Sequence, residues 1–127
     1  VACGGGGIPV FKTEGHHLKG AAAVIDKDFA SEVLAEELNA DVLIILTAVE
    51  KVAVNFGKPD QKWLDGLTPE EARKYMDEGQ FAPGSMLPKV QAAVKFAESR
   101  PGRRALITLL EKAGAGVAGE TGTTITL

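Results

Sequence analysis

Residues 41–47 read Asp-Val-Leu-Ile-Ile-Leu-Thr (DVLIILT), and this stretch decides the fold class. The apolar run inside it is continuous and does not alternate with polar residues. A continuous apolar strand is typical of a parallel sheet that is covered by helices on both faces. We therefore predict a buried strand here. Ligands of open α/β sheets bind beyond the carboxyl ends of such strands, so Thr47 to Phe56 are candidate ligand contacts, with simple core packing as the competing interpretation.

Helical and strand patterns alternate around this strand, which predicts an α/β protein with a mainly parallel sheet. The segment 26–38 is a predicted helix. Asp26 and Asp28 stand in its first turn, where carboxylates suit the helix dipole. Its expected inward-facing side chains, at three-to-four spacing, are Phe29, Val33, Leu34 and Leu38.

The remaining elements lie toward the C-terminus. Thr68, Pro69 and Glu71 form a helix start with a capping box, and this helix is expected to stop near Gly79. The other expected elements are a hairpin of strands at 52–56 and 62–64, a helix from 86 or 87 to 98, a strand at 105–109, a helix at 110–118 weakened by Gly114 and Gly116, and a final strand at 121–127.

The N-terminal segment is rich in glycine. Residues 1–3 are small and apolar and read as the end of a buried strand, Gly4–Gly7 follow, and 11–20 reads as a surface loop. Four glycines remove every Cβ, so the backbone can bend sharply and approach a ligand. The loop is either an anion-binding turn or an ordinary tight turn, since it has neither the dinucleotide fingerprint nor a P-loop ending.

Length and composition limit the function classes. The chain has 127 residues, which fits one domain, and we expect 1–127 to be a single domain cut from a longer protein. The formal net charge of −3 argues against a nucleic-acid binder. No apolar run is long enough for a membrane span, and the lone Cys3 favours a reducing, cytoplasmic setting.

Two lysines stand in settings that suit a bound phosphate. Lys27 is flanked by carboxylates at a helix start, which fits phosphoryl transfer or, alternatively, plain capping beside a solvated lysine. Lys89 follows the loop 81–88 and lies one turn into a helix. A cation there has the wrong sign for the helix dipole, so a bound anion and an ordinary surface lysine are equally open. His16 and His17 have no third ligand at metal spacing, and we predict no metal-ligating residues.

Taken together, the motifs resemble one family. ACGGGGIPV, AVIDKDFAS, LAEELNADVLIILTAV, NFGKPDQ, FAPGSMLPKVQAA and GETGTTI, in this order and spacing, are similar to carbamate kinases of the amino-acid kinase superfamily. The resemblance covers nearly the whole chain. It implies half of an amino-acid-kinase fold, a three-layer α/β/α sandwich around a mainly parallel sheet.

The resemblance also implies an activity. Carbamate kinases interconvert ATP plus carbamate with ADP plus carbamoyl phosphate, using Mg²⁺, and are usually cytosolic homodimers. Their C-terminal half mostly holds the nucleotide, and this chain resembles that half. We expect an ATP- or ADP-binding half of a carbamate kinase that is inactive or poorly active alone. The alternative is a non-catalytic or engineered half-domain that binds nucleotide or dimerises.

Site residues carry over by motif. Lys27 would contact the transferring phosphoryl group, and Asp28 would orient the lysines or the metal. Lys89 would touch the nucleotide phosphates. Gly4, Gly5 and Gly6 would face the carbamate-type acceptor. The residues expected around the adenosine are Thr47, Val49, Phe56, Ala82, Pro83, Gly84, Ser85 and Met86.

The sequence departs from the family pattern at a few positions. Everything before the glycine loop is absent, which removes residues that the family needs for transfer. Glu50 stands where aspartate is expected, near the presumed base pocket, and Gln80 stands where histidine is common. Removing half of a continuous sheet would also expose a strand edge and invite self-association.

Overall fold

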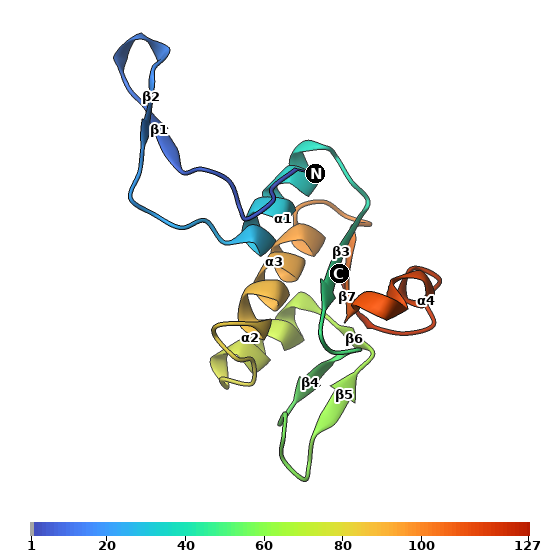
Figure 1. Cartoon of the computed structure of the whole chain (residues 1–127). Helices are drawn as coiled ribbons and strands as arrows, with labels where there is room; N and C mark the ends of the chain where they lie inside the picture. The colour runs from blue at the N-terminus through green and yellow to red at the C-terminus, as the bar shows by residue number, and fades with distance from the viewer. Residues whose placement is uncertain (1) are drawn as a thin grey trace.

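The computed structural model describes residues 2–127, so the predicted strand residue Val1 lies outside the described part. Helices and strands alternate along most of the chain (Figure 1). In chain order they are β1 Val10–Lys12, the 3-10 turn η1 Glu14–His16, β2 Leu18–Gly20, α1 Lys27–Glu37, β3 Val42–Thr47, β4 Val52–Val54, β5 Lys62–Leu64, β6 Gly66–Leu67, α2 Pro69–Asp77, α3 Met86–Glu98, β7 Arg104–Leu109, η2 Leu110–Lys112, α4 Ala113–Val117 and β8 Thr123–Thr126.

The central sheet has the strand order β3-β7-β8-β6. β3 and β7 run parallel, with Ile44 opposite Leu106, and β6 and β8 are also parallel. β7 and β8 run antiparallel, with Ile107 opposite Thr123. The sheet is mainly parallel, and the α/β class predicted from the alternating patterns is confirmed.

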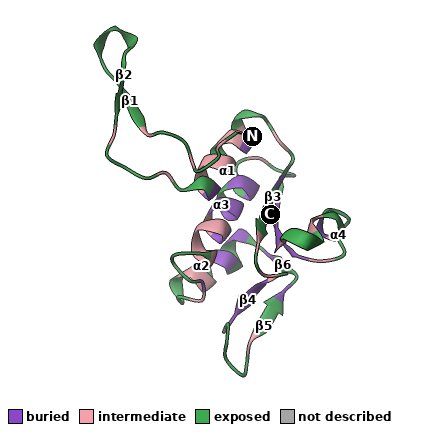
Figure 2. Cartoon of the chain, viewed as in Figure 1, coloured by how far each residue is buried: buried purple, intermediate pink, exposed green. Residues whose placement is uncertain are grey.

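Helices form layers on the two sides of this sheet (Figure 1). α3 packs directly on β7 and β8, while α1 and α2 pack on α3. The short α4 lies against β7 on the opposite side. The most deeply buried part of the molecule runs along α3 and the middle of the sheet (Figure 2), and its large apolar side chains are Val52, Val90, Phe96, Ile107 and Ile125.

A glycine permits the close approach of α4 to the sheet. A Cβ added at Gly116 would lie 2.9 Å from Leu106 Cδ2 and 3.1 Å from Thr108 Cγ2. Contacts under 3.0 Å force a neighbour to move. Gly116, which weakens α4 as a helix, is therefore what allows α4 to pack closely on β7.

The predicted apolar face of α1 is right only in part: Phe29 packs against the core and Leu34 is half-buried. Val33 and Leu38 are 48% and 71% exposed, whereas the buried residues of the helix include Asp28 and Glu32. Lysines on α3 pair with both buried carboxylates, which compensates part of the cost of removing charge from water. The helix boundaries were right because Asp26 accepts hydrogen bonds from the Asp28 and Phe29 backbone N–H groups and so caps the N-terminus.

The strand predicted at 41–47 is confirmed as β3. The predicted cover on both of its faces is not observed. Its burial alternates: Leu43 and Ile45 are buried, while Val42, Ile44 and Leu46 are each more than a third exposed. β3 stands at one end of the sheet order, and α4 does not extend over all of its outer face.

The N-terminal segment differs from the prediction in two ways. Ala2 lies in no regular element, and residues 3–6 form a turn with a bend on each side, instead of the end of a strand. The predicted surface loop contains the antiparallel hairpin β1–β2, in which Val10 pairs with Gly20. This hairpin projects from the body and is exposed throughout (Figures 1 and 2). Its side chains bury nothing, so the sequence offered no apolar pattern by which to predict it.

Candidate functional site

A cavity of about 420 Å³ opens beyond the carboxyl end of β3. Its walls come from the segment after β3, from the β4–β5 hairpin, and from the loop between α2 and α3. This volume falls in the range of small-molecule sites. The lining residues are Thr47, Ala48, Val49, Lys51, Ala53, Asn55, Phe56, Lys58, Gly79, Gln80, Phe81, Ala82, Ser85 and Met86.

The structure brings together most of the residues predicted to surround the adenosine. Pro83 and Gly84 belong to the same loop but do not line the cavity. Lys89 does not line it either, and lies one helical turn beyond Met86. The predicted residues that do line the cavity are Thr47, Val49, Phe56, Ala82, Ser85 and Met86.

The β4–β5 hairpin forms one wall through the tip between its strands. Phe56 is 63% exposed and meets Trp63 edge-on, with ring centroids 6.2 Å apart. Asn55 adopts φ = 53°, and its side-chain amide donates to Asp60 Oδ2 at 2.8 Å. The Gly57 N–H donates to Gln61 Oε1 at 2.8 Å. These bonds stay inside the tip, whose aromatic ring Phe56 lines the cavity.

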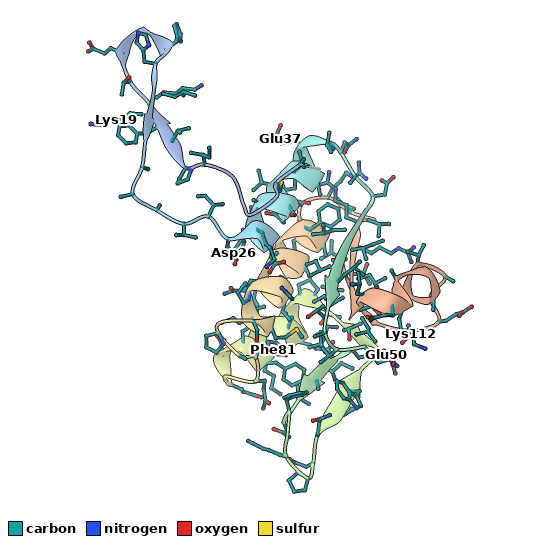
Figure 3. The ribbon with its side chains drawn as sticks, in the orientation of Figure 1. Lys19, Asp26, Glu37, Glu50, Phe81 and Lys112 are labelled. Carbon is teal, nitrogen blue, oxygen red and sulfur yellow. The ribbon has the colours of Figure 1, made fainter. Side chains whose placement is uncertain are left out.

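The loop between α2 and α3 forms the facing wall (Figure 3, where Phe81 marks it). Phe81 is 3% exposed and packs edge-on against Tyr75, which anchors the loop in the core. Ser85 is the N-cap residue of α3, but its side chain makes no capping hydrogen bond. The Ser85 and Leu87 N–H groups donate to the Ala82 carbonyl. The start of α3, with its partial positive charge, therefore stands at the cavity.

The predicted phosphate residues form one ionic cluster. Lys89 Nζ on α3 donates to Asp28 Oδ2 on α1 at 2.8 Å, and Lys27 Nζ lies 3.7 Å from the same oxygen. The side chains of Asp28 and Lys89 are only 10% and 13% exposed, whereas Lys27 is 59% exposed. Asp28 therefore holds Lys89 in one position and leaves Lys27 open to a ligand.

The glycine loop lies beside this cluster. Gly6 adopts φ = 110°, and a Cβ there would stand 2.4 Å from the Ile25 carbonyl oxygen. Cys3 Sγ donates to the Ala30 carbonyl oxygen at 3.5 Å. Only glycine fits this close approach, which places residues 3–6 against the start of α1, where Lys27 and Asp28 stand. The predicted acceptor-side residues Gly4, Gly5 and Gly6 are thus near the predicted catalytic pair.

A second ionic cluster joins α1 to α3 further along. Glu32 is fully buried, Lys95 Nζ donates to its Oε2 at 2.7 Å, and Glu36 Oε1 lies 3.9 Å from the same nitrogen. Burial is the main cause that raises the pKa of Glu32 above its usual value, with the neighbouring Glu36 adding to it and Lys95 opposing it. The hydrogen bond to Glu32 raises the pKa of Lys95. None of the three residues of this cluster lines the cavity.

The two departures from the family pattern have different places in the structure. Glu50, labelled in Figure 3, does not line the cavity: its carboxylate accepts from Thr121 Oγ1, and its backbone carbonyl accepts from Thr108 Oγ1 at 3.3 Å. Gln80 does line the cavity, and its Oε1 accepts from the Asn55 N–H at 2.8 Å.

The site residues named from the sequence leave out several residues of the cavity. Lys51 and Asn55 fall inside the candidate range Thr47 to Phe56 but were not singled out, and Lys58, Gly79 and Gln80 lie outside that range and outside the predicted loop 81–88. The signals were present, since NFGKPDQ was part of the family resemblance and Gln80 was noted as a departure from it. The side chains themselves gave no pattern, because they meet only when the hairpin folds back toward the end of α2.

Within residues 2–127 no group of three or more His, Cys, Asp or Glu side chains could hold a metal ion. Asp28, the one acidic residue predicted near the phosphates, already accepts from lysine. None of the helices that the structure describes is long and apolar enough to cross a membrane.

Comparison with known proteins supports a kinase relationship at the level of sequence. The chain is 62% identical over 125 residues to the carbamate kinase-like protein YqeA of Escherichia coli, covering 98% of this chain and 40% of that protein. It is 59% identical over 125 residues to the carbamate kinase of Clostridium perfringens, with the same coverage. The chain thus spans about 40% of the length of these relatives. The fraction of the relatives that is covered does not show which part of them this chain matches. The predicted correspondence to a C-terminal half is therefore not confirmed.

Solved structures give the same relationship. The carbamate kinase of Giardia lamblia bound to AMP-PNP aligns with a TM-score of 0.89 and 42% identity, covering 96% of this chain and 42% of that one. The uridylate kinase of Archaeoglobus fulgidus aligns at 21% identity with a TM-score of 0.59, which shows a shared fold. The model of the amino acid kinase family matches residues 2–108, most of the chain. The chain therefore belongs to the amino acid kinase family.

Proposed function

We propose that this chain is the nucleotide-binding part of a carbamate kinase, which holds ATP or ADP for phosphoryl transfer between ATP and carbamate. The cavity carries this proposal: it combines an exposed aromatic ring, Phe56, with the start of a long helix, and Lys89 stands one turn further along that helix. The bound analogue in the Giardia relative supports a nucleotide as the ligand.

The cavity offers different chemistry at its two ends. Thr47, Val49 and Phe56 give a surface on which a flat base can stack. At the start of α3, the Ser85 side chain does not cap the helix, and the partial positive charge of the helix N-terminus suits a phosphate. We therefore place the base against Phe56 and the phosphates toward Lys89.

The lysines and Asp28 account for the phosphate end. Phosphoryl transfer is catalysed mainly by positioning and by stabilising charge on the migrating group. Lys89, held by Asp28, supplies a fixed positive charge, and the more exposed Lys27 supplies a second one at the start of α1. Gly4 and Gly5 have open space beside them for a carbamate-sized acceptor, while Gly6 packs closely against Ile25.

The nucleotide, when bound, supplies the phosphoryl group and its Mg²⁺. Magnesium is usually held by substrate phosphates with one or two carboxylates and water, so it needs no cage of protein side chains. Asp28 is engaged by lysine, which favours its role in orienting the lysines.

Calorimetric titration with ADP and Mg²⁺ tests the nucleotide proposal. Lys89→Met removes the predicted phosphate contact. Lys95→Met is the matched control, because Lys95 is on the same helix and also pairs with a carboxylate of α1. We expect the Lys89 variant to bind at least about tenfold more weakly than the chain itself, and the Lys95 variant to bind like it. Equal loss in both variants, or no binding by the folded chain, would contradict the proposal.

A second function is a binding module without catalysis. The chain spans about 40% of its relatives, and the residues that complete their reaction need not all be here. Formation of ATP from ADP and carbamoyl phosphate by this chain would rule out the non-catalytic module. Absence of ATP formation together with ADP binding would support it.

A further inference from the structure

The side chain of Gln80 joins two walls of the cavity, the β4–β5 tip and the loop between α2 and α3. Gln80 follows the end of α2, where its own N–H donates to the Tyr75 carbonyl at 2.9 Å and so fixes its backbone. Its carboxamide Oε1 reaches across and accepts from the Asn55 N–H at 2.8 Å. Asn55 belongs to the β4–β5 tip, in which Phe56 and Lys58 line the cavity.

The ladder of the β4–β5 hairpin does not use the Asn55 N–H. The last pair of that ladder is Val54 with Lys62, and Asn55 then turns into a left-handed conformation, φ = 53°. The other bonds of the tip stay inside it: Asn55 to Asp60 and Gly57 to Gln61. Gln80 is thus the side chain that ties a preformed tip to the facing loop.

We propose that Gln80 is a positioning residue of the cavity, which holds the β4–β5 tip against the loop between α2 and α3 and thereby sets the affinity for the nucleotide base. The inference rests on the proposed function, since the ligand is the nucleotide. If the wall is already fixed in the free protein, the ligand does not have to order it on binding. Less of the binding free energy is then lost as conformational entropy. Gln80 acts through the tip, and Phe56 makes the contact.

Three variants test this inference with ADP and Mg²⁺ as the probe. Gln80→Met keeps the length of the side chain and removes the acceptor. Gln80→Glu keeps an acceptor oxygen. Gln61→Met is the matched control, because it removes a bond of the same length that stays within the tip.

Two readouts are needed, calorimetric affinity for ADP and amide hydrogen exchange of Asn55 in the free protein. We expect Gln80→Met to weaken ADP binding about fivefold and to speed amide exchange at Asn55 by a similar factor. This is the change expected from the loss of one hydrogen bond. Gln80→Glu should restore protection of Asn55. Gln61→Met should change neither quantity by more than about twofold. If Gln80→Met lowers the melting temperature enough to interfere, Gln80→Ser breaks the same bond with a shorter polar side chain.

The outcomes separate the inference from the proposed function. If the chain binds ADP and Gln80→Met binds it equally well, the inference is overturned and the nucleotide site stands. If Asn55 exchanges at the same rate in Gln80→Met, the positioning role is also overturned. If the unchanged chain does not bind ADP, the proposed function fails and the affinity role fails with it.

Discussion

Glu32 places a carboxyl group inside the interface of α1 and α3, and one of its oxygens, Oε1, has no hydrogen-bond partner among residues 2–127. Burial removes water from a carboxyl group and so disfavours its charged form. Lys95 pairs with the other oxygen but is 54% exposed, so it offsets burial only in part. The net result is the raised pKa of Glu32.

Stability should therefore depend on pH through Glu32. A carboxyl group whose pKa is higher in the folded protein binds more protons there than in the unfolded chain, so the free energy of unfolding falls as pH rises above the usual value of 4.5. We expect Glu32→Gln to flatten this part of the profile. Urea unfolding at pH 5 and pH 8 measures it, with Glu98→Gln as a surface control. A steeper fall in the Glu32 variant than in the wild type would contradict the assignment.

Asp28 accepts directly from Lys89, and the side chains of both residues are poorly exposed. Asp28→Asn leaves the ammonium group without its counter-charge and should lower the free energy of unfolding by about 2 kcal/mol. Adding Lys89→Met should recover part of that loss, since the uncompensated charge is then removed. Chemical denaturation of the two single variants and the double variant gives the coupling. Additive losses would mean that the pair contributes no interaction free energy.

At the scale of elements, α2 begins with a complete capping box. The Thr68 side chain accepts from the Glu71 N–H, and Glu71 Oε2 accepts from the Thr68 N–H. The bond from the Thr68 N–H is the main cause that lowers the pKa of Glu71. This contribution to stability is present above the usual carboxyl range and is lost as pH falls.

Thr68→Ala removes the cap and should cost about 1 kcal/mol of stability. Thermal unfolding near neutral pH measures the loss. Thr68→Ser is the control, because serine can keep the capping bond. If Thr68→Ser destabilises as much as Thr68→Ala, the hydroxyl group is not what stabilises the helix start.

The elements that the sequence predicted well are those with local signals. The boundaries of α1 and α2 follow from Asp26 and Thr68, whose caps need only residues within a turn. The buried face of α1 was predicted only in part, because its carboxylates point inward only where lysines of α3 meet them. The sequence analysis missed β6 and the hairpin β1–β2. These strands are short, and they are recognised from the backbone pairing with their partner strands and not from a pattern of side chains.

The cavity shows the same division. Residues that follow β3 were predicted from a rule about where ligands bind on parallel sheets, and the loop before α3 from its helix start. Gln80 and Asn55 were not among the predicted site residues, because their contact joins segments 25 residues apart. The residue roles carried over from the family resemblance stay predictions.

At the scale of the whole molecule, the sheet ends at β3. Val42, Ile44 and Leu46 are more than a third exposed there, and an unpaired strand edge favours pairing with another chain. We expect this chain to self-associate in sedimentation equilibrium, in line with the homodimer that the family resemblance implies. Ile44→Lys should shift it toward the monomer, whereas Val33→Lys, an exposed apolar position on α1, should not. A wild-type chain that stays monomeric at high concentration would contradict the expectation.

The central claim is that the cavity beyond β3 holds a nucleotide. Backbone amide chemical shifts during titration with ADP and Mg²⁺ test it most directly. The account predicts that the largest shifts fall on the three walls, at Thr47, Asn55, Gly79 and Ser85, with little change on the β1–β2 hairpin or α4. Shifts confined to those distant elements, or no shifts from a folded chain at millimolar ADP, would contradict it.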